Sequence, residues 1–242
     1  MEYNIGRTEE ITIYSNALQE ELTLLVYKPS NYSSLYKYHL VIAQDGQDYF
    51  NLGRIARVTE ELIQEKRIPN TIIVGIPYGN VRDRKDKYHP DGSQKDAYIR
   101  FLAHELVPYL DDQYPTYQMG RGRVLIGDSL GATISLLAGL QYPHTFGKIA
   151  LQSPYVDETV LTKVENFPSP HLLQLYHTFG TKEVDVKTTD GTIKDFVTPN
   201  RSLAELIKNK SYEALLNQFE GDHTWTYWQP DLKNALHYIL ND

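Results

Sequence analysis

Residues 124–133 read VLIGDSLGAT: a short apolar run that suits a strand leads through G-x-S-x-G directly into small residues that suit a helix. The pattern predicts a strand that turns into a helix without an intervening loop, an arrangement known as a nucleophile elbow. So sharp a bend needs residues with little or no side chain, and Gly127 and Gly131 supply them. We therefore expect Ser129 at the exposed tip, with the backbone N–H of Leu130 at a helix N-terminus that favours negative charge.

The chain on both sides of this stretch alternates between strand-like and helix-like segments. Residues 11–14 and 22–27 are short β-branched and aromatic runs that predict an opening antiparallel pair. Further strands are predicted at 38–44, 71–76, 148–152, 172–179 and 212–219, and helices at 55–66, 98–110, 130–142, 156–164, 202–208 and 231–240. This order predicts an α/β fold in which helices cover both faces of a mostly parallel sheet. No segment between adjacent elements is long enough for a cap domain.

Residues 78–93 have no hydrophobic periodicity and are expected to form a long loop after the strand at 71–76. In open α/β sheets, the carboxyl ends of the strands border the ligand site. The loop contains Arg82 and Arg84 among charges of both signs. These arginines are expected to be solvated, or in the alternative to contact an anionic substrate.

Composition limits the class of protein. The 242 residues are 41% hydrophobic and 23% charged, which suits one globular domain over residues 1–242. The formal charge of -7 argues against nucleic acid or an anionic membrane surface as the main partner. The absence of cysteine excludes disulfides, thiolate zinc sites and a cysteine nucleophile. The first residues do not resemble a signal peptide and no stretch approaches about 18 apolar residues, so we expect a cytoplasmic protein. The composition does not decide whether the chain forms homo-oligomers.

A serine hydroxyl is a weak nucleophile at neutral pH and needs a base that a third group orients. In chains with this type of elbow, the acid and then the histidine follow the serine. His223 is the predicted base, because it lies on a glycine-containing turn after the last predicted strand. The other histidines after Ser129 lie too soon after a helix, at the two ends of one strand, or inside the last helix: His144, His171, His177 and His237.

Two acidic residues are candidates for the third group. Glu183 and Asp185 both lie just beyond the strand at 172–179, and their spacing does not separate them. A second donor for an oxyanion is expected from the turn at residues 45–47, Asp-Gly-Gln, after the strand at 38–44. The glycine would let the backbone N–H of Gln47 point toward the developing charge.

Several motifs in this order resemble the putative-esterase family of α/β-hydrolases, which includes esterase D, enterochelin-type siderophore esterases and mycolyltransferases. They are DGQ at 45–47, FLAHELVPYL at 101–110, GDSLG at 127–131, GTKE at 180–183 and GDHTWTYW at 221–228. The resemblance covers roughly residues 22–240 and implies an α/β-hydrolase fold. Site residues are implied as follows: Ser129 as nucleophile, His223 as base, Glu183 as preferred acid with Asp185 in reserve, and the N–H groups of Gln47 and Leu130 as the oxyanion hole.

Contacts to substrate are expected from Asp45, Arg82, Trp225 and Trp228. The two tryptophans are predicted to line the pocket for the acyl or alcohol group. The other prediction is that at least one of them packs under the loop that carries His223.

The function that the residues predict is a serine carboxylesterase, which hydrolyses small-molecule esters through a covalent acyl-enzyme without metal or organic cofactor. The resemblance suits hydrolysis of siderophore esters and general carboxylester hydrolysis equally, because this fold hosts many acyl chemistries. Alternatives with the same residues are a thioesterase similar to S-formylglutathione hydrolases and an acyltransferase. A non-catalytic binding protein would predict a broken catalytic set, whereas every required group is present.

Overall fold

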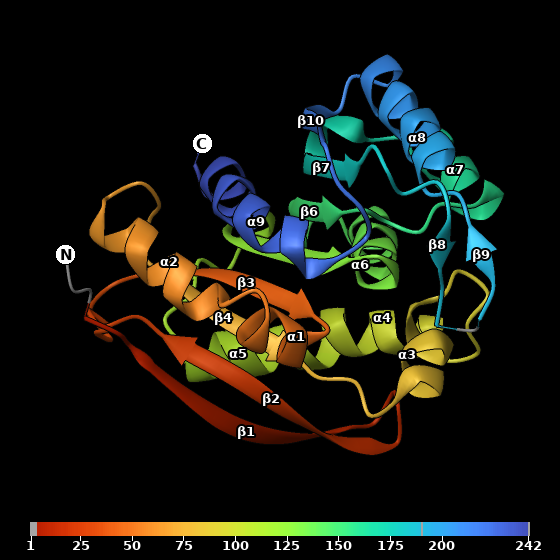
Figure 1. Ribbon diagram of the computed structural model, residues 1–242. Helices are drawn as coiled ribbons and strands as arrows, with labels where there is room; N and C mark the ends of the chain where they lie inside the picture. Colours follow the sequence, from red (N-terminus) through yellow and green to blue (C-terminus); the bar gives the residue numbers. More distant parts are fainter. Residues whose placement is uncertain (1–3, 190, 242) are drawn as a thin grey trace.

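An eight-stranded sheet forms the centre of the structure, a computed structural model that describes residues 4–189 and 191–241 (Figure 1). The strand order is β1-β2-β4-β3-β5-β6-β7-β10. The bounds are β1 Arg7–Ser15, β2 Glu20–Lys28, β3 His39–Gln44, β4 Thr71–Ile76, β5 Arg123–Asp128, β6 Lys148–Gln152, β7 Gln174–Gly180 and β10 Glu213–Phe219. β2 pairs antiparallel with β1 and β4, and the strands from β4 to β10 pair in parallel. The predicted α/β fold with a mostly parallel sheet is confirmed.

Helices cover both faces of this sheet (Figure 1). They are α1 Gly46–Asn51, α2 Ile55–Gln64, α3 Val81–Tyr88, α4 Lys95–Arg100, α5 Val107–Gln113, α6 Leu130–Gln141, α7 Glu158–Glu165, α8 Val197–Asn209 and α9 Trp225–Leu240, with a π-helical turn at Phe101–Leu106 that joins α4 to α5. One core cluster, which includes Leu62 and Leu236, lies under α2 and α9. The other includes Leu102 and Leu136 and lies under α4 to α6. Each face of the sheet is therefore closed by its own apolar layer.

The segment predicted as a loop at 78–93 contains the helix α3, and this prediction is wrong. The side chain of Asn80 caps the helix by accepting the N–H groups of Arg82 and Asp83. Arg84 and Lys87 are buried on the inner face of α3, where each pairs with a carboxylate. Because charged residues occupy the buried face, the helix shows no hydrophobic period in the sequence.

Two further features differ from the predicted elements. A hairpin of β8 Val186–Lys187 and β9 Ile193–Lys194 lies between β7 and α8 and extends toward α3 (Figure 1). The last helix begins at Trp225 rather than at residue 231, so that Pro230 lies inside it. None of the helices in the described ranges is long and apolar enough to cross a bilayer.

Candidate active site

Ser129 occupies the turn between β5 and α6, with φ 52° and ψ -123°. A positive φ is strained for a residue with a side chain, and such strain is typical of sites where function requires a particular exposure. Gly127 is required here, since an added Cβ would lie 2.2 Å from the backbone carbon of Gly131. The close approach of β5 and α6 turns the Ser129 side chain out of the sheet, into a pocket.

His223 lies between β10 and α9 and lines the same pocket as Ser129. Its Nδ1 is 3.0 Å from Oε2 of Glu183, whose side chain is 0% exposed. The other carboxylate oxygen accepts the Ser153 hydroxyl at 2.6 Å and the Gly180 N–H at 2.8 Å. A carboxylate at Nδ1 selects the tautomer in which Nε2 is free to accept a proton. The geometry thus suits a general base whose orientation Glu183 fixes.

Asp185, the alternative acid, is exposed and makes no hydrogen bond or ion pair with the described residues. The structure therefore brings Glu183 and not Asp185 to His223. The Ser129 hydroxyl is likewise without a hydrogen bond in the described part of the chain. In free enzymes such contacts are often long and shorten in the substrate complex.

The backbone N–H groups of Gln47 and Leu130 lie in the first turns of α1 and α6. Neither has an acceptor among residues 4–189 and 191–241, as is usual for the first N–H groups of a helix. The two turns are close together, because a Cβ added at Gly131 would lie 2.9 Å from Oδ2 of Asp45. Two unused donors at adjacent helix N-termini could hold an oxyanion.

A buried ion pair between Arg84 and Asp45 connects the segments that precede α1 and α6. Arg84 of α3 donates from Nε to Oδ1 of Asp45 at 2.8 Å and from Nη2 to Oδ2 at 2.6 Å. Nη2 also approaches the carbonyl oxygen of Asp128 at 3.4 Å. Burial, together with the charge of Asp45, raises the pKa of Asp128 to about 8. Asp45, expected to contact substrate, is instead occupied in fixing the turn before Gln47.

The other three residues expected at the substrate lie outside the pocket. The Arg82 side chain is 93% exposed and lies 3.8 Å from Asp86 on the same helix. Trp228 is buried, and its Nε1 donates to the hydroxyl of Ser153 at 2.9 Å. Trp225 packs edge-on against Trp228, with ring centroids 5.7 Å apart. Trp228 also packs edge-on against the ring of His223, with centroids 4.7 Å apart, so that this tryptophan supports the loop that carries His223.

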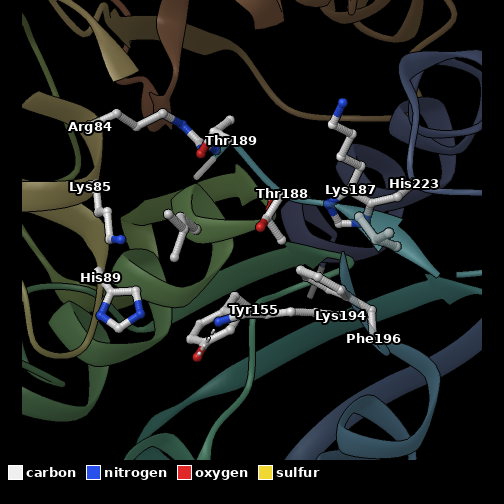
Figure 2. A pocket seen from close by; sticks show the side chains of 13 residues that line it. Arg84, Lys85, His89, Tyr155, Lys187, Thr188, Thr189, Lys194, Phe196 and His223 are labelled. Carbon is white, nitrogen blue, oxygen red and sulfur yellow. Dashed lines mark hydrogen bonds between the residues drawn. The ribbon is translucent and has the colours of Figure 1, made fainter. Parts of the chain in front are cut away.

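The pocket lies between α3 and the hairpin of β8 and β9, with the elbow at its base, and encloses about 100 Å³ (Figure 2). Besides Ser129, Leu130 and His223 it is lined by Arg84, Lys85, His89, Tyr155, Val186, Lys187, Thr188, Thr189, Lys194 and Phe196. Except for Arg84, these ten residues were not among the predicted site residues. Most of them come from α3 and from the hairpin, neither of which has a recognisable pattern in the sequence. His89 directly follows α3, Tyr155 lies between β6 and α7, and Phe196 directly precedes α8. The described residues contain no cluster of His, Cys, Asp or Glu that could hold a metal ion.

The strand order, with the elbow at the end of β5 and the histidine after the last strand, defines an α/β-hydrolase. The sequence matches the family described as putative esterase over residues 15–239. It is 56% identical over 235 residues to uncharacterized protein YjcH of Bacillus subtilis, an alignment that covers 97% of this chain and 98% of YjcH. The chain belongs to the putative esterase family, and this membership supports ester hydrolysis as its activity.

Solved structures share the fold. The enterobactin esterase FES from Shigella flexneri matches with a TM-score of 0.82 at 18% identity, over 96% of this chain and 58% of FES. This chain therefore spans less than two thirds of the FES chain. A ferulic acid esterase matches with a TM-score of 0.80 at 14% identity, over 99% of this chain and 98% of that one. At these identities the likeness concerns the fold alone.

Proposed function

We propose that this chain is a serine carboxylesterase in which Ser129 is the nucleophile, His223 the base and Glu183 the acid that orients the base. The observation that carries the proposal is the contact of 3.0 Å between Glu183 and His223, in a pocket that also exposes Ser129. A buried carboxylate, a histidine and a serine on a strained turn are the groups that covalent acyl transfer requires.

In the first step, Oγ of Ser129 attacks the carbonyl carbon of the ester while its proton moves to Nε2 of His223. The carbonyl oxygen becomes negative and is held by the N–H groups of Gln47 and Leu130. The bond to the alcohol oxygen then breaks, and His223 gives the proton to that oxygen. Glu183 stabilises the imidazolium that exists between these two events.

In the second step, a water molecule gives a proton to His223 and attacks the carbonyl carbon of the acyl-enzyme. The bond to Oγ breaks, the proton returns to Ser129, and the carboxylic acid leaves. An acceptor alcohol in place of water would make the same site an acyltransferase, and a thioester in place of the ester would make it a thioesterase.

The size of the pocket favours a small substrate group. Pockets for drug-sized ligands usually hold about 300–1,000 Å³, whereas this one encloses about 100 Å³. We therefore favour esters of small acids or small alcohols over siderophore trilactones as the substrates.

The test is hydrolysis of a p-nitrophenyl ester series from acetate to octanoate by the wild type and by Ser129→Ala. We expect turnover that is highest for the short esters, and a loss of at least about 1,000-fold in kcat in the variant. Ser202→Ala on the exposed surface of α8 is the matched control and should retain full activity. Equal turnover in Ser129→Ala would refute the proposal. If the wild type hydrolyses none of these esters, a fluorophosphonate should still label Ser129, and failure of that labelling would also refute the proposal.

A further inference from the structure

The pocket has a charge opposite to that of the chain as a whole. The chain carries 31 acidic and 24 basic residues. Among the described residues that line the pocket, four are lysine or arginine and none is aspartate or glutamate: Arg84, Lys85, Lys187 and Lys194. Arg84 is engaged with Asp45, so it adds little to the charge that a substrate meets.

Lys194 and Tyr155 form the centre of this basic region. The Nζ atom of Lys194 lies 4.5 Å from the centroid of the Tyr155 ring and donates to its hydroxyl at 3.2 Å. Because the hydroxyl oxygen accepts this bond, the hydroxyl proton is available to another acceptor. No described carboxylate lies at ion-pair distance from Lys194. The ammonium group of Lys194 is therefore available for an ion pair with a ligand.

His89 adds a third donor beside the same ring. Its ring centroid lies 5.2 Å from that of Tyr155, and its Nδ1 accepts the N–H of Asp91 at 3.1 Å. The proton of a neutral His89 must then be on Nε2. Burial lowers the pKa of His89, so the neutral form prevails at pH 7. Figure 2 shows His89, Tyr155 and Lys194 gathered at one end of the pocket.

Three donors and no acceptor are an arrangement that suits an anion. A carboxylate offers two oxygens and about four acceptor sites, so that it can take bonds from Lys194, Tyr155 and His89 together. Charge-assisted bonds of this kind are stronger than neutral ones. A neutral group of the same size would leave the lysine without a partner when it displaces water.

We propose that Lys194, Tyr155 and His89 form a subsite for a carboxylate on the substrate, so that this chain prefers esters with a negative charge over neutral esters. The inference rests on the proposed esterase function and narrows it to two classes: half-esters of dicarboxylic acids, in which the acyl part is charged, and acyl esters of hydroxy acids, in which the alcohol part is charged. In either class the ester carbon lies at Ser129 and the carboxylate at Lys194.

The experiment compares two matched pairs of esters. Phenyl hydrogen adipate and phenyl adipamate differ by a charge on the acyl side, and 4-acetoxybenzoate and 4-acetoxybenzamide by a charge on the alcohol side. In at least one of the two pairs, kcat/KM of the wild type should be about tenfold higher for the charged ester than for the neutral one, as expected for a hydrogen-bonded ionic contact. Lys194→Met should reduce this ratio to about one, and Lys194→Arg should restore most of it. Lys208→Met, which removes an exposed charge on α8, should leave the ratio unchanged.

The possible results separate the two proposals. A ratio near one in both pairs, with turnover of the neutral esters, would overturn the subsite and leave the esterase in place. A high ratio that survives in Lys194→Met would also overturn it. If no ester is hydrolysed, the esterase proposal fails, and the subsite is tested by calorimetry with 4-acetamidobenzoate and 4-acetamidobenzamide. The charged ligand should then bind about tenfold more tightly, and equal binding would refute the subsite.

Discussion

Ser153 is a residue outside the proposed catalytic set, and its replacement should affect both stability and activity. Its hydroxyl is fully buried between β6 and the loop that carries His223. It donates to Glu183 at 2.6 Å and accepts the indole N–H of Trp228 at 2.9 Å. Its backbone has φ 47°, which is strained for any residue other than glycine. Ser153→Ala and Ser153→Gly both remove the hydroxyl, but only glycine relieves the backbone.

The expected loss follows from these contacts. A hydrogen bond to a charged group contributes about 1.5–3 kcal/mol, and a buried donor left without an acceptor costs about 1–3 kcal/mol. Repacking recovers part of this, so we expect Ser153→Ala to lower the free energy of unfolding by about 2–4 kcal/mol. Ser153→Gly should be about 1 kcal/mol more stable than Ser153→Ala, because it removes the strain.

Activity distinguishes a positioning role from a purely structural one. If Ser153 holds Glu183 against His223, both variants should lose about 10–100-fold in kcat at nearly unchanged KM, despite their different stabilities. The measurements are urea unfolding followed by tryptophan fluorescence and hydrolysis of a short p-nitrophenyl ester. A kcat that follows stability, with Ser153→Gly close to the wild type, would contradict a role of the hydroxyl in orienting the acid.

Three further predictions concern the acid, the buried ion pair and Asp128. Glu183→Gln should lower kcat by about 10,000-fold, while Asp185→Asn should remain within about twofold of the wild type in the same ester assay. Arg84→Met leaves the Asp45 carboxylate buried without a partner and should lower the free energy of unfolding in urea by about 3–5 kcal/mol; an unchanged urea midpoint would refute a stabilising role of this buried ion pair. For Asp128, the folded pKa of about 8 is above the unfolded value, so the wild type should lose stability as the pH rises from about 4 to 8 and level off above. Asp128→Asn should gain stability relative to the wild type over that range, and a constant difference in unfolding free energy between the two would contradict the raised pKa.

The sheet and the elbow could be predicted because their physical requirements are local. Strands buried on both faces, such as β3 and β4, must be continuously apolar, and this is visible in the sequence. The turn at Ser129 requires glycine on both sides, and the resulting motif is short and specific. The positions of His223 and of the turn before Gln47 follow from the order of the strands.

The pocket walls could not be predicted, because they depend on distant contacts. The inner face of α3 is buried through Arg84 and Lys87, and their partners Asp45 and Glu20 are far away in the sequence. No local pattern marks a helix whose buried side is charged. β8 and β9 have two residues each, too few to show an alternation.

The choice between Glu183 and Asp185 also depends on tertiary structure. The two acids are separated by one residue on the same turn. Ser153 donates to Glu183 only because β6 and β7 pair side by side, which brings a residue 30 positions earlier under the turn. Spacing along the chain therefore carries no information about which carboxylate faces the histidine.

The hairpin of β8 and β9 contributes side chains to the pocket, but none of its described residues belongs to the two apolar core clusters. It supplies Val186, Lys187, Thr188, Thr189 and Lys194 to the pocket, yet it forms its own two-stranded sheet apart from the central one. Substitutions in it disturb little of either apolar core. Selection, natural or in a library of hairpin variants, could therefore exchange one ester preference for another while the unfolding free energy and the reaction chemistry stay almost constant.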